Sequence, residues 1–166
     1  MLVGRSRALF RSASDSNLLP GRSIEAIAAA SVYAACRCNG LPRTLSEIGD
    51  VAKVATDRVD HAYNILNREL GLPAVPTPPV EYVPRFASQV DLPDEVRYRA
   101  KTLAEQAVDN GLANGCNPAG LAAACVYVAA RERGERVVQT DLAELADVTP
   151  VTLRARWEDL QPLLDE

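Results

Sequence analysis

The stretch IAAASVYAACRCNGLPRTLSEIGDVAKVATDRVDHAYNIL, residues 27–66, occurs again in diverged form as LAAACVYVAARERGERVVQTDLAELADVTPVTLRARWEDL, residues 121–160. The two segments align without a gap at a constant offset of 94 residues. The same residue recurs at Ala28/Ala122, Ala29/Ala123, Ala30/Ala124, Val32/Val126, Tyr33/Tyr127, Ala35/Ala129, Arg37/Arg131, Gly40/Gly134, Ala52/Ala146, Val54/Val148 and Leu66/Leu160. A match that keeps one register over this length indicates two copies of one structural unit.

Each copy has the pattern of three successive helices. The first expected helix is rich in alanine and ends near a glycine, and its small side chains are typical of the central helix of a bundle. A short helix and then, after a brief turn, a longer helix follow in the layout of a helix-turn-helix. The expected helices lie near 22–37, 44–53 and from Thr56 in the first copy, and near 117–132, 138–147 and from Thr149 in the second.

The last helix of the second copy has a well-defined start. Thr149 is a residue type favoured at the N-cap, and Pro150 is favoured at the first helical position. Apolar residues follow at helical spacing, so one face of this helix is expected to be buried and the opposite face, with Val151 and Arg154, to be exposed. The buried stripe is Leu153, Trp157, Leu160 and Leu164, which aligns with Val59, Tyr63, Leu66 and Leu70.

A proline-rich segment separates the two copies. The sequence GLPAVPTPPV (71–80) cannot continue a helix and is expected to form a semi-rigid connector between units at 1–70 and 81–166. Two further helices, near 81–89 and 94–110, precede the second copy, whereas residues 5–19 supply a single helix before the first. The prediction is an all-α chain of two five-helix units in tandem, the first incomplete at its N-terminus.

Composition limits the class of protein. The chain has 166 residues, of which 48% are apolar, enough for one sizeable core or two small ones. It has no apolar run of the roughly 20 residues that span a bilayer and no signal-peptide pattern, so we expect a cytoplasmic protein that does not contact a membrane. Acidic residues outnumber basic ones by 22 to 18, which argues against a large basic surface for nucleic acid.

The sequence contains no pattern typical of a metal site or of an active site. Its four cysteines lack the paired spacing of zinc ligands, and His61 has no neighbouring cysteine or carboxylate pattern. We therefore expect no bound metal, no cofactor and no enzymatic activity.

Five stretches resemble the C-terminal core of archaeal transcription factor B and of its eukaryotic counterpart, transcription factor IIB. They are GRSIEAIAAASVYAACR, LPRTLSEIGDVAKV, VEYVPRFASQVDLPDEVRYRA, NPAGLAAACVYVAAR and VTPVTLRARW, and the resemblance covers residues 5–163. It implies two cyclin-like repeats that bind the complex of TATA-binding protein with promoter DNA and recruit RNA polymerase. In that family the second repeat reads the B-recognition element upstream of the TATA box.

The resemblance places base contacts on Val151 and Arg154. Arginine can bond guanine in the major groove, and a small apolar side chain can meet a thymine methyl group. The aligned residues of the first copy are Asp57 and Asp60, which would repel phosphates. Further candidates for phosphate or base contacts are Thr149, Thr152, Arg156 and Gln139 in the second copy, and Arg37, Arg43 and Thr44 in the first.

The chain also departs from the family that it resembles. Relatives usually carry basic residues within the segment that reads RVV here (136–138) and often at the positions of Cys116 and Glu158, so DNA binding by the chain alone is expected to be weak. The zinc ribbon that docks on polymerase is not in this sequence, so the contact with RNA polymerase is expected to be weak or absent.

Two hypotheses follow. The chain is either a monomeric, promoter-binding core of an initiation factor, or a cyclin-box interaction module, such as a truncated paralogue, that regulates transcription through protein contacts without binding DNA. For Arg154 there is a simpler alternative, a surface ion pair with Glu158 four residues further on.

Overall fold

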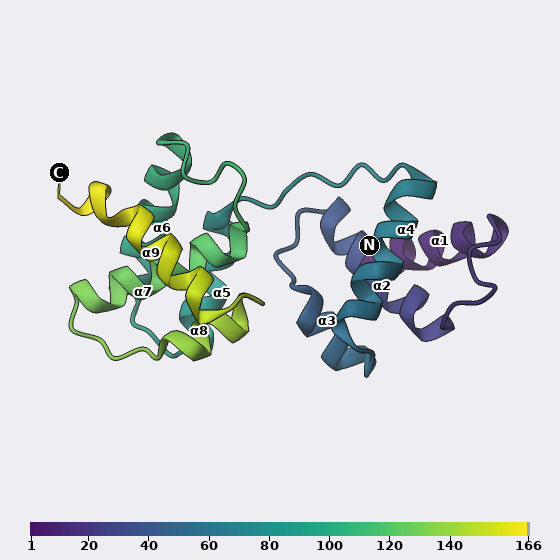
Figure 1. Cartoon of the computed structure of the whole chain (residues 1–166), viewed down its shortest axis with the longest axis horizontal. Helices are drawn as coiled ribbons and strands as arrows, with labels where there is room; N and C mark the ends of the chain where they lie inside the picture. The colour runs from purple at the N-terminus through teal and green to yellow at the C-terminus, as the bar shows by residue number, and fades with distance from the viewer. Residues whose placement is uncertain (166) are drawn as a thin grey trace. The chain divides into compact units, whose positions relative to one another are not determined.

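The computed structural model describes residues 1–165, which form nine helices and no strand (Figure 1). The helices are α1 (Leu2–Asp15), α2 (Ile24–Cys38), α3 (Leu45–Ala52), α4 (Thr56–Leu70), α5 (Pro79–Gln89), α6 (Asp94–Asp109), α7 (Pro118–Glu132), α8 (Gln139–Leu145) and α9 (Pro150–Leu164). The predicted all-α class is confirmed. None of the described helices is long and apolar enough to cross a bilayer.

The chain divides into two compact units. The first is Met1–Thr77 and the second begins at Pro78, so the division falls within the proline-rich segment 71–80. The first unit holds α1 to α4 and the second holds α5 to α9.

The offset of 94 residues holds in the backbone as well as in the sequence. Helices α2 and α7 begin and end at aligned residues, and so do α4 and α9. Backbone turns with positive φ also recur at this offset, at Asn17/Gly111, Gly21/Gly115, Gly40/Gly134 and Lys53/Asp147. Because residues other than glycine adopt positive φ only at a cost, the recurrence shows that both copies follow the same local path.

Helix α7 is the central helix of the second unit, and it contacts α5, α6, α8 and α9. Eleven of its residues are buried, and most of them are small. Its start is fixed by Asn117, whose side-chain oxygen accepts hydrogen bonds from the backbone N–H groups of Ala119 (2.9 Å) and Gly120 (3.3 Å). Large side chains from the surrounding helices complete the core, among them Phe86, Leu103, Leu142, Leu153 and Leu160, each fully buried.

The first unit repeats this plan around α2, which contacts α1, α3 and α4. The expected helix at 5–19 is placed a few residues too late, because α1 ends at Asp15, just before the chain turns with positive φ at Asn17. In the alignment α1 corresponds to all of α6 except its first two residues, Asp94 and Glu95, and both helices end at aligned residues, Asp15 and Asp109. Among residues 1–165 the first unit has no counterpart of α5.

Aromatic pairs join the aligned helices in the same way in both units. The rings of Tyr33 and Tyr63 lie edge to face with their centroids 4.9 Å apart, and those of Tyr127 and Trp157 do so at 6.2 Å. These contacts pack α2 on α4 and α7 on α9, so Tyr33 and Tyr127 are packing residues.

Candidate nucleic-acid interface

The exposed start of α9 is held by a tight turn and an N-cap. Helix α8 is followed by Asp147, which has a φ of 58°, and α9 then begins at Pro150. The Thr149 hydroxyl accepts a hydrogen bond from the backbone N–H of Thr152 at 3.2 Å, and the two threonine hydroxyls lie 3.0 Å apart. This cap satisfies a backbone donor of the first turn, so the start of the helix is well defined.

The side chains of the first turn of α9 differ in their exposure to solvent. Val151 is 78% exposed and Arg154 is exposed, whereas Leu153 is fully buried. Within residues 1–165, Arg154 makes no hydrogen bond or ion pair, so the alternative pair with Glu158 does not form. An unpaired guanidinium beside an exposed apolar side chain on one helix tip has the chemistry needed to read base edges in the major groove.

The other candidate side chains on α8 and α9 either contact residues of the protein itself or are partly buried. Thr149 and Thr152 form the cap, and the Arg156 guanidinium pairs with the Asp159 carboxylate at 3.2 Å. The Nε atom of Arg156 is also buried without a hydrogen-bond partner in the described part of the chain. Gln139 is partly buried as the first residue of α8. Their contacts with DNA stay predictions, and for Arg156 such a contact competes with Asp159.

Arg131 is a cation that our sequence analysis did not select. Its guanidinium carbon lies 5.8 Å from the centroid of the Tyr127 ring and 5.5 Å from that of the Trp157 ring. Cation–π attraction to both rings gives this exposed positive charge a defined position on the second unit. The signal was present in the sequence, because Arg131 is identical to its aligned residue Arg37, but we selected Arg37 alone.

The aligned tip of α4 has a different chemistry. Asp57 occupies the position of Val151, and Asp60 that of Arg154. Ala55 takes the place of the capping threonine, and α4 has no side-chain hydrogen bond at its start. The first unit therefore lacks the apolar and arginine pair of the second, as the sequence predicted.

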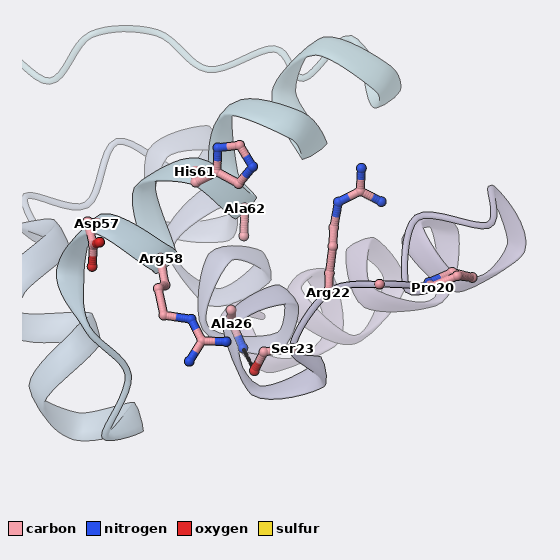
Figure 2. A pocket seen from close by; sticks show the side chains of 9 residues that line it. Pro20, Arg22, Ser23, Ala26, Asp57, Arg58, His61 and Ala62 are labelled. Atoms are coloured by element: carbon pink, nitrogen blue, oxygen red, sulfur yellow. Dashed lines mark hydrogen bonds between the residues drawn. The ribbon is translucent and has the colours of Figure 1, made fainter.

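A polar cavity of about 620 Å³ lies beside this tip, between the starts of α2 and α4 (Figure 2). Its lining includes Arg22, Arg58 and His61, together with Asp57 and the N-cap Ser23. Figure 2 shows the Arg22 and Arg58 side chains pointing in different directions, with the latter next to the start of α2. Because these cations do not converge and a carboxylate lies among them, the arrangement does not define an anion site.

The three candidates of the first unit lie around the start of α3 and the end of α2. Thr44 and Glu47 form a capping box, in which the Thr44 backbone N–H donates to the Glu47 carboxylate at 2.8 Å and the Glu47 backbone N–H donates to the Thr44 hydroxyl at 3.4 Å. Thr44 is only 6% exposed, so this side chain has a structural role. Arg43 lies 3.6 Å from Glu47, and Arg37 is partly buried. Contacts of these three residues with phosphate stay predictions.

Two helical units with one order of helices, each ending in a helix-turn-helix, define a protein of tandem cyclin-like repeats. A family model described as transcription factor TFIIB repeat matches residues 3–69 and 75–162, one match in each unit. The chain therefore belongs to the transcription factor TFIIB family.

Nearly half of the aligned residues are identical between this chain and its archaeal relatives. Transcription initiation factor IIB of Methanosphaerula palustris and that of Methanoculleus marisnigri are each 46% identical over 157 residues, covering 95% of this chain and 47% of the relative. Transcription initiation factor IIB 1 of Halobacterium salinarum is 47% identical over 152 residues, covering 92% of this chain and 53% of the relative. The chain thus spans about half the length of the curated relatives it matches.

Proposed function

We propose that this chain binds promoter DNA together with TATA-binding protein during transcription initiation, and that the tip of α9 reads the upstream element. The observation that carries the proposal is the start of α9, where Arg154 has no partner within residues 1–165 and Val151 is 78% exposed. Arginine can donate two hydrogen bonds to the O6 and N7 atoms of guanine, and valine can pack on a thymine methyl group. Membership of the family supports a role in initiation.

The net charge of the chain favours a mechanism in which base contacts supply sequence preference and a protein partner holds the chain on the promoter. The chain has a net charge of −4, so its general attraction to phosphates is weak. A good bidentate contact between arginine and guanine contributes roughly 1–3 kcal/mol of discrimination. The chain therefore adds sequence preference at one element, while TATA-binding protein holds it on the promoter.

A gel-shift titration tests this function. Labelled promoter DNA bound to TATA-binding protein is titrated with the chain, and the concentration that produces the supershifted complex is measured. Arg154→Ala is expected to raise that concentration about 5- to 150-fold, the equivalent of roughly 1–3 kcal/mol. A matched control is Arg68→Ala, which also removes one positive charge from an exposed arginine, 72% exposed and located in the last turn of α4.

Changing the DNA distinguishes base reading from simple charge attraction. Replacing the guanines of the upstream element should weaken binding of the unaltered chain and leave the Arg154→Ala variant almost unaffected, because the contact is already lost. If Arg68→Ala weakens the complex as much as Arg154→Ala does, the proposed reading by α9 is wrong.

The second candidate function is an interaction module without DNA binding. It is favoured by the acidic tip of α4, where Asp57 and Asp60 replace the reading pair, and by the excess of acidic residues. This alternative predicts no supershift at any salt concentration, together with capture of TATA-binding protein by the chain in the absence of DNA.

A further inference from the structure

The turns that lead into α4 and α9 have the same hydrogen bonds but are packed differently. In the first unit the Val54 backbone N–H donates to the Gly49 carbonyl oxygen at 2.9 Å. In the second unit the Val148 backbone N–H donates to the Ala143 carbonyl oxygen at 3.0 Å. The two valines are aligned, and so are the two acceptors, so an alanine of α8 stands where α3 has a glycine.

In the first unit the turn lies against α3, where Gly49 has no side chain. A Cβ added at Gly49 would lie 2.7 Å from the Val54 carbonyl oxygen, far inside the optimal separation of non-bonded atoms. Ala143 carries a Cβ at the aligned position and is buried. The Val148 carbonyl oxygen therefore cannot approach α8 as closely as the Val54 carbonyl oxygen approaches α3.

In the second unit the turn lies against α7, where Gly120 has no side chain. A Cβ added at Gly120 would lie 3.3 Å from the Cγ1 atom of Val148 and 3.9 Å from its Cγ2 atom, so this valine packs directly on the glycine. The aligned residue of the first unit is Ala26, which lines the polar cavity between α2 and α4 (Figure 2). Glycine and alanine are thus exchanged between the two helices that hold the turn.

Val148 is connected directly to the exposed tip of α9. It precedes the N-cap residue Thr149, whose carbonyl oxygen accepts a hydrogen bond from the Leu153 backbone N–H at 3.0 Å. Leu153 is fully buried, so the capped turn and the core together hold this end of the helix. A displacement of Val148 is therefore transmitted to Val151 and Arg154.

We propose that Gly120 is a positioning residue for the recognition of DNA by α9. Its lack of a side chain allows Val148 to pack on α7, and this contact sets the position of Val151 and Arg154. An added methyl group must displace the valine by a few tenths of an ångström. Hydrogen bonds between arginine and guanine depend on distance and angle, so such a shift weakens base reading more than it weakens the fold. The inference rests on the proposed function, because it concerns the same tip.

The variants Gly120→Ala and Gly120→Val test this role by filling the space in two steps. The quantity to measure is the guanine preference of the chain. It is the ratio of two affinities for promoter DNA bound to TATA-binding protein, with the guanines of the upstream element present and with them replaced. Gly120→Ala should reduce this ratio by about threefold or more, and Gly120→Val should reduce it almost to one. Loss of folded protein alone lowers both affinities equally and leaves the ratio unchanged.

Gly4 provides a matched control. Like Gly120 it is the third residue of its helix, and among residues 1–165 an added Cβ would meet nothing within 4 Å. Gly4→Ala and Gly4→Val should therefore leave the guanine preference unchanged. Val148→Ala provides a rescue, because it removes the two methyl groups that the added Cβ approaches. The double variant Gly120→Ala/Val148→Ala should regain most of the preference that Gly120→Ala loses.

Amide NMR spectra of the unbound chain give a readout that does not involve DNA. The signals of residues 149–154 should shift in the two Gly120 variants and stay in place in the two Gly4 variants. Circular dichroism should show unchanged helix content for Gly120→Ala, the milder of the two substitutions.

Three results would overturn the inference. The first is a guanine preference that persists in both Gly120 variants, and the second is an equal loss of preference in the Gly4 variants. The third is the absence of any shift in the signals of residues 149–154. A different result, an unaltered chain without guanine preference, would show that the proposed function itself is wrong, and the role of Gly120 in base reading would fall with it.

Discussion

Val151 and Leu153 lie two positions apart on α9 and have opposite environments. The valine is 78% exposed, whereas the leucine is fully buried in the core of the second unit. Truncating a buried leucine to alanine removes transfer free energy and leaves a cavity, so Leu153→Ala should lower the free energy of unfolding by about 2–5 kcal/mol. Val151→Ala should change it by less than about 0.5 kcal/mol. Urea denaturation of both variants measures the difference, and similar losses would show that the two side chains are not placed as described.

The four cysteines should differ in reactivity according to their burial. Burial raises the pKa of the Cys125 thiol to about 12, and it also raises the pKa of Cys36. Because the thiolate is the reactive form, these two side chains are protected well into the alkaline range. Cys38 and Cys116 are partly exposed.

Alkylation with iodoacetamide, followed by peptide mass mapping, should therefore modify Cys38 and Cys116 first in the native protein. Cys125 should react only after unfolding in denaturant. Modification of Cys125 at the rate of Cys38 under native conditions would contradict its burial in α7.

At the scale of single residues, the helical spacing of apolar side chains predicted which side chains are exposed, but not which of them form ion pairs or contacts with aromatic rings. The helical spacing correctly placed Val151 and Arg154 on the solvent face of α9. It could not show that Arg156 pairs with Asp159, or that Arg131 lies over two rings contributed by different helices. Such contacts depend on side-chain conformations and, for Arg131, on the packing of α7 against α9.

Helices α4 and α9 allow a test of capping within one chain. The start of α9 is capped by Thr149, whereas Ala55 stands at the aligned position of α4 without a side-chain hydrogen bond. Since an N-cap threonine is worth about 1 kcal/mol relative to alanine, Thr149→Ala should lower stability by about that amount, and Ala55→Thr should raise it by up to as much. Chemical denaturation of the two variants gives both values. Opposite signs are required, and a destabilising Ala55→Thr would mean that the two turns differ in geometry.

Helices α6 and α7 are joined by an ion pair that makes stability depend on pH. The Arg99 guanidinium donates two hydrogen bonds to the Glu132 carboxylate, at 2.7 and 3.0 Å, and this interaction lowers the pKa of Glu132. A carboxyl group whose pKa is lower in the folded protein stabilises the fold above its ordinary pKa of 4.5, and this stabilisation is lost as the pH falls through the lowered value.

Replacing Glu132→Gln should therefore lower the melting temperature at neutral pH and have a smaller effect in acid, where the native carboxyl is itself protonated. Both side chains are about one-third exposed, so the loss should be roughly 1 kcal/mol or less. Thermal melts over a series of pH values measure it. A loss that is the same at all pH values would assign the effect to packing instead of charge.

At the scale of helices, the internal repeat predicted the helices and their ends better than the local sequence preferences for helix starts and stops did. The shared register correctly indicated paired helices, and α2 with α7 and α4 with α9 have aligned ends in the structure. The end of α1 was missed because the stop signal is weak in the first copy. Asn17 takes the positive φ there, whereas the aligned residue of the second copy is Gly111, a clearer marker of a helix end.

For the whole molecule, the sequence predicted the division into two units because prolines interrupt the helical pattern between them. The sequence did not show that Ala28 and Val32 of α2 are exposed to solvent, because the identical aligned residues, Ala122 and Val126, are buried in the second unit. Exposure at these positions depends on the neighbouring helix, which no pattern within α2 itself encodes. The two units therefore differ in burial at aligned positions that carry the same residues.

This difference predicts unequal stability of the two units. In the second unit α5 packs on α7, the Arg99–Glu132 ion pair joins α6 to α7, and the Arg133–Glu95 ion pair joins α6 to the residue that follows α7. The aligned residues of the first unit, Arg5 with Cys38 and Asn39 with Met1, cannot form such pairs. Local unfolding should therefore occur more readily around α2 than around α7.

Hydrogen exchange of the intact chain, followed by mass spectrometry, measures this difference directly. Backbone amides of α2 should exchange at least about tenfold faster than those of α7, which corresponds to roughly 1.4 kcal/mol less free energy for opening. If α2 and α7 exchange at the same rate, the exposed face of α2 has no energetic consequence and the first unit is stabilised by other contacts.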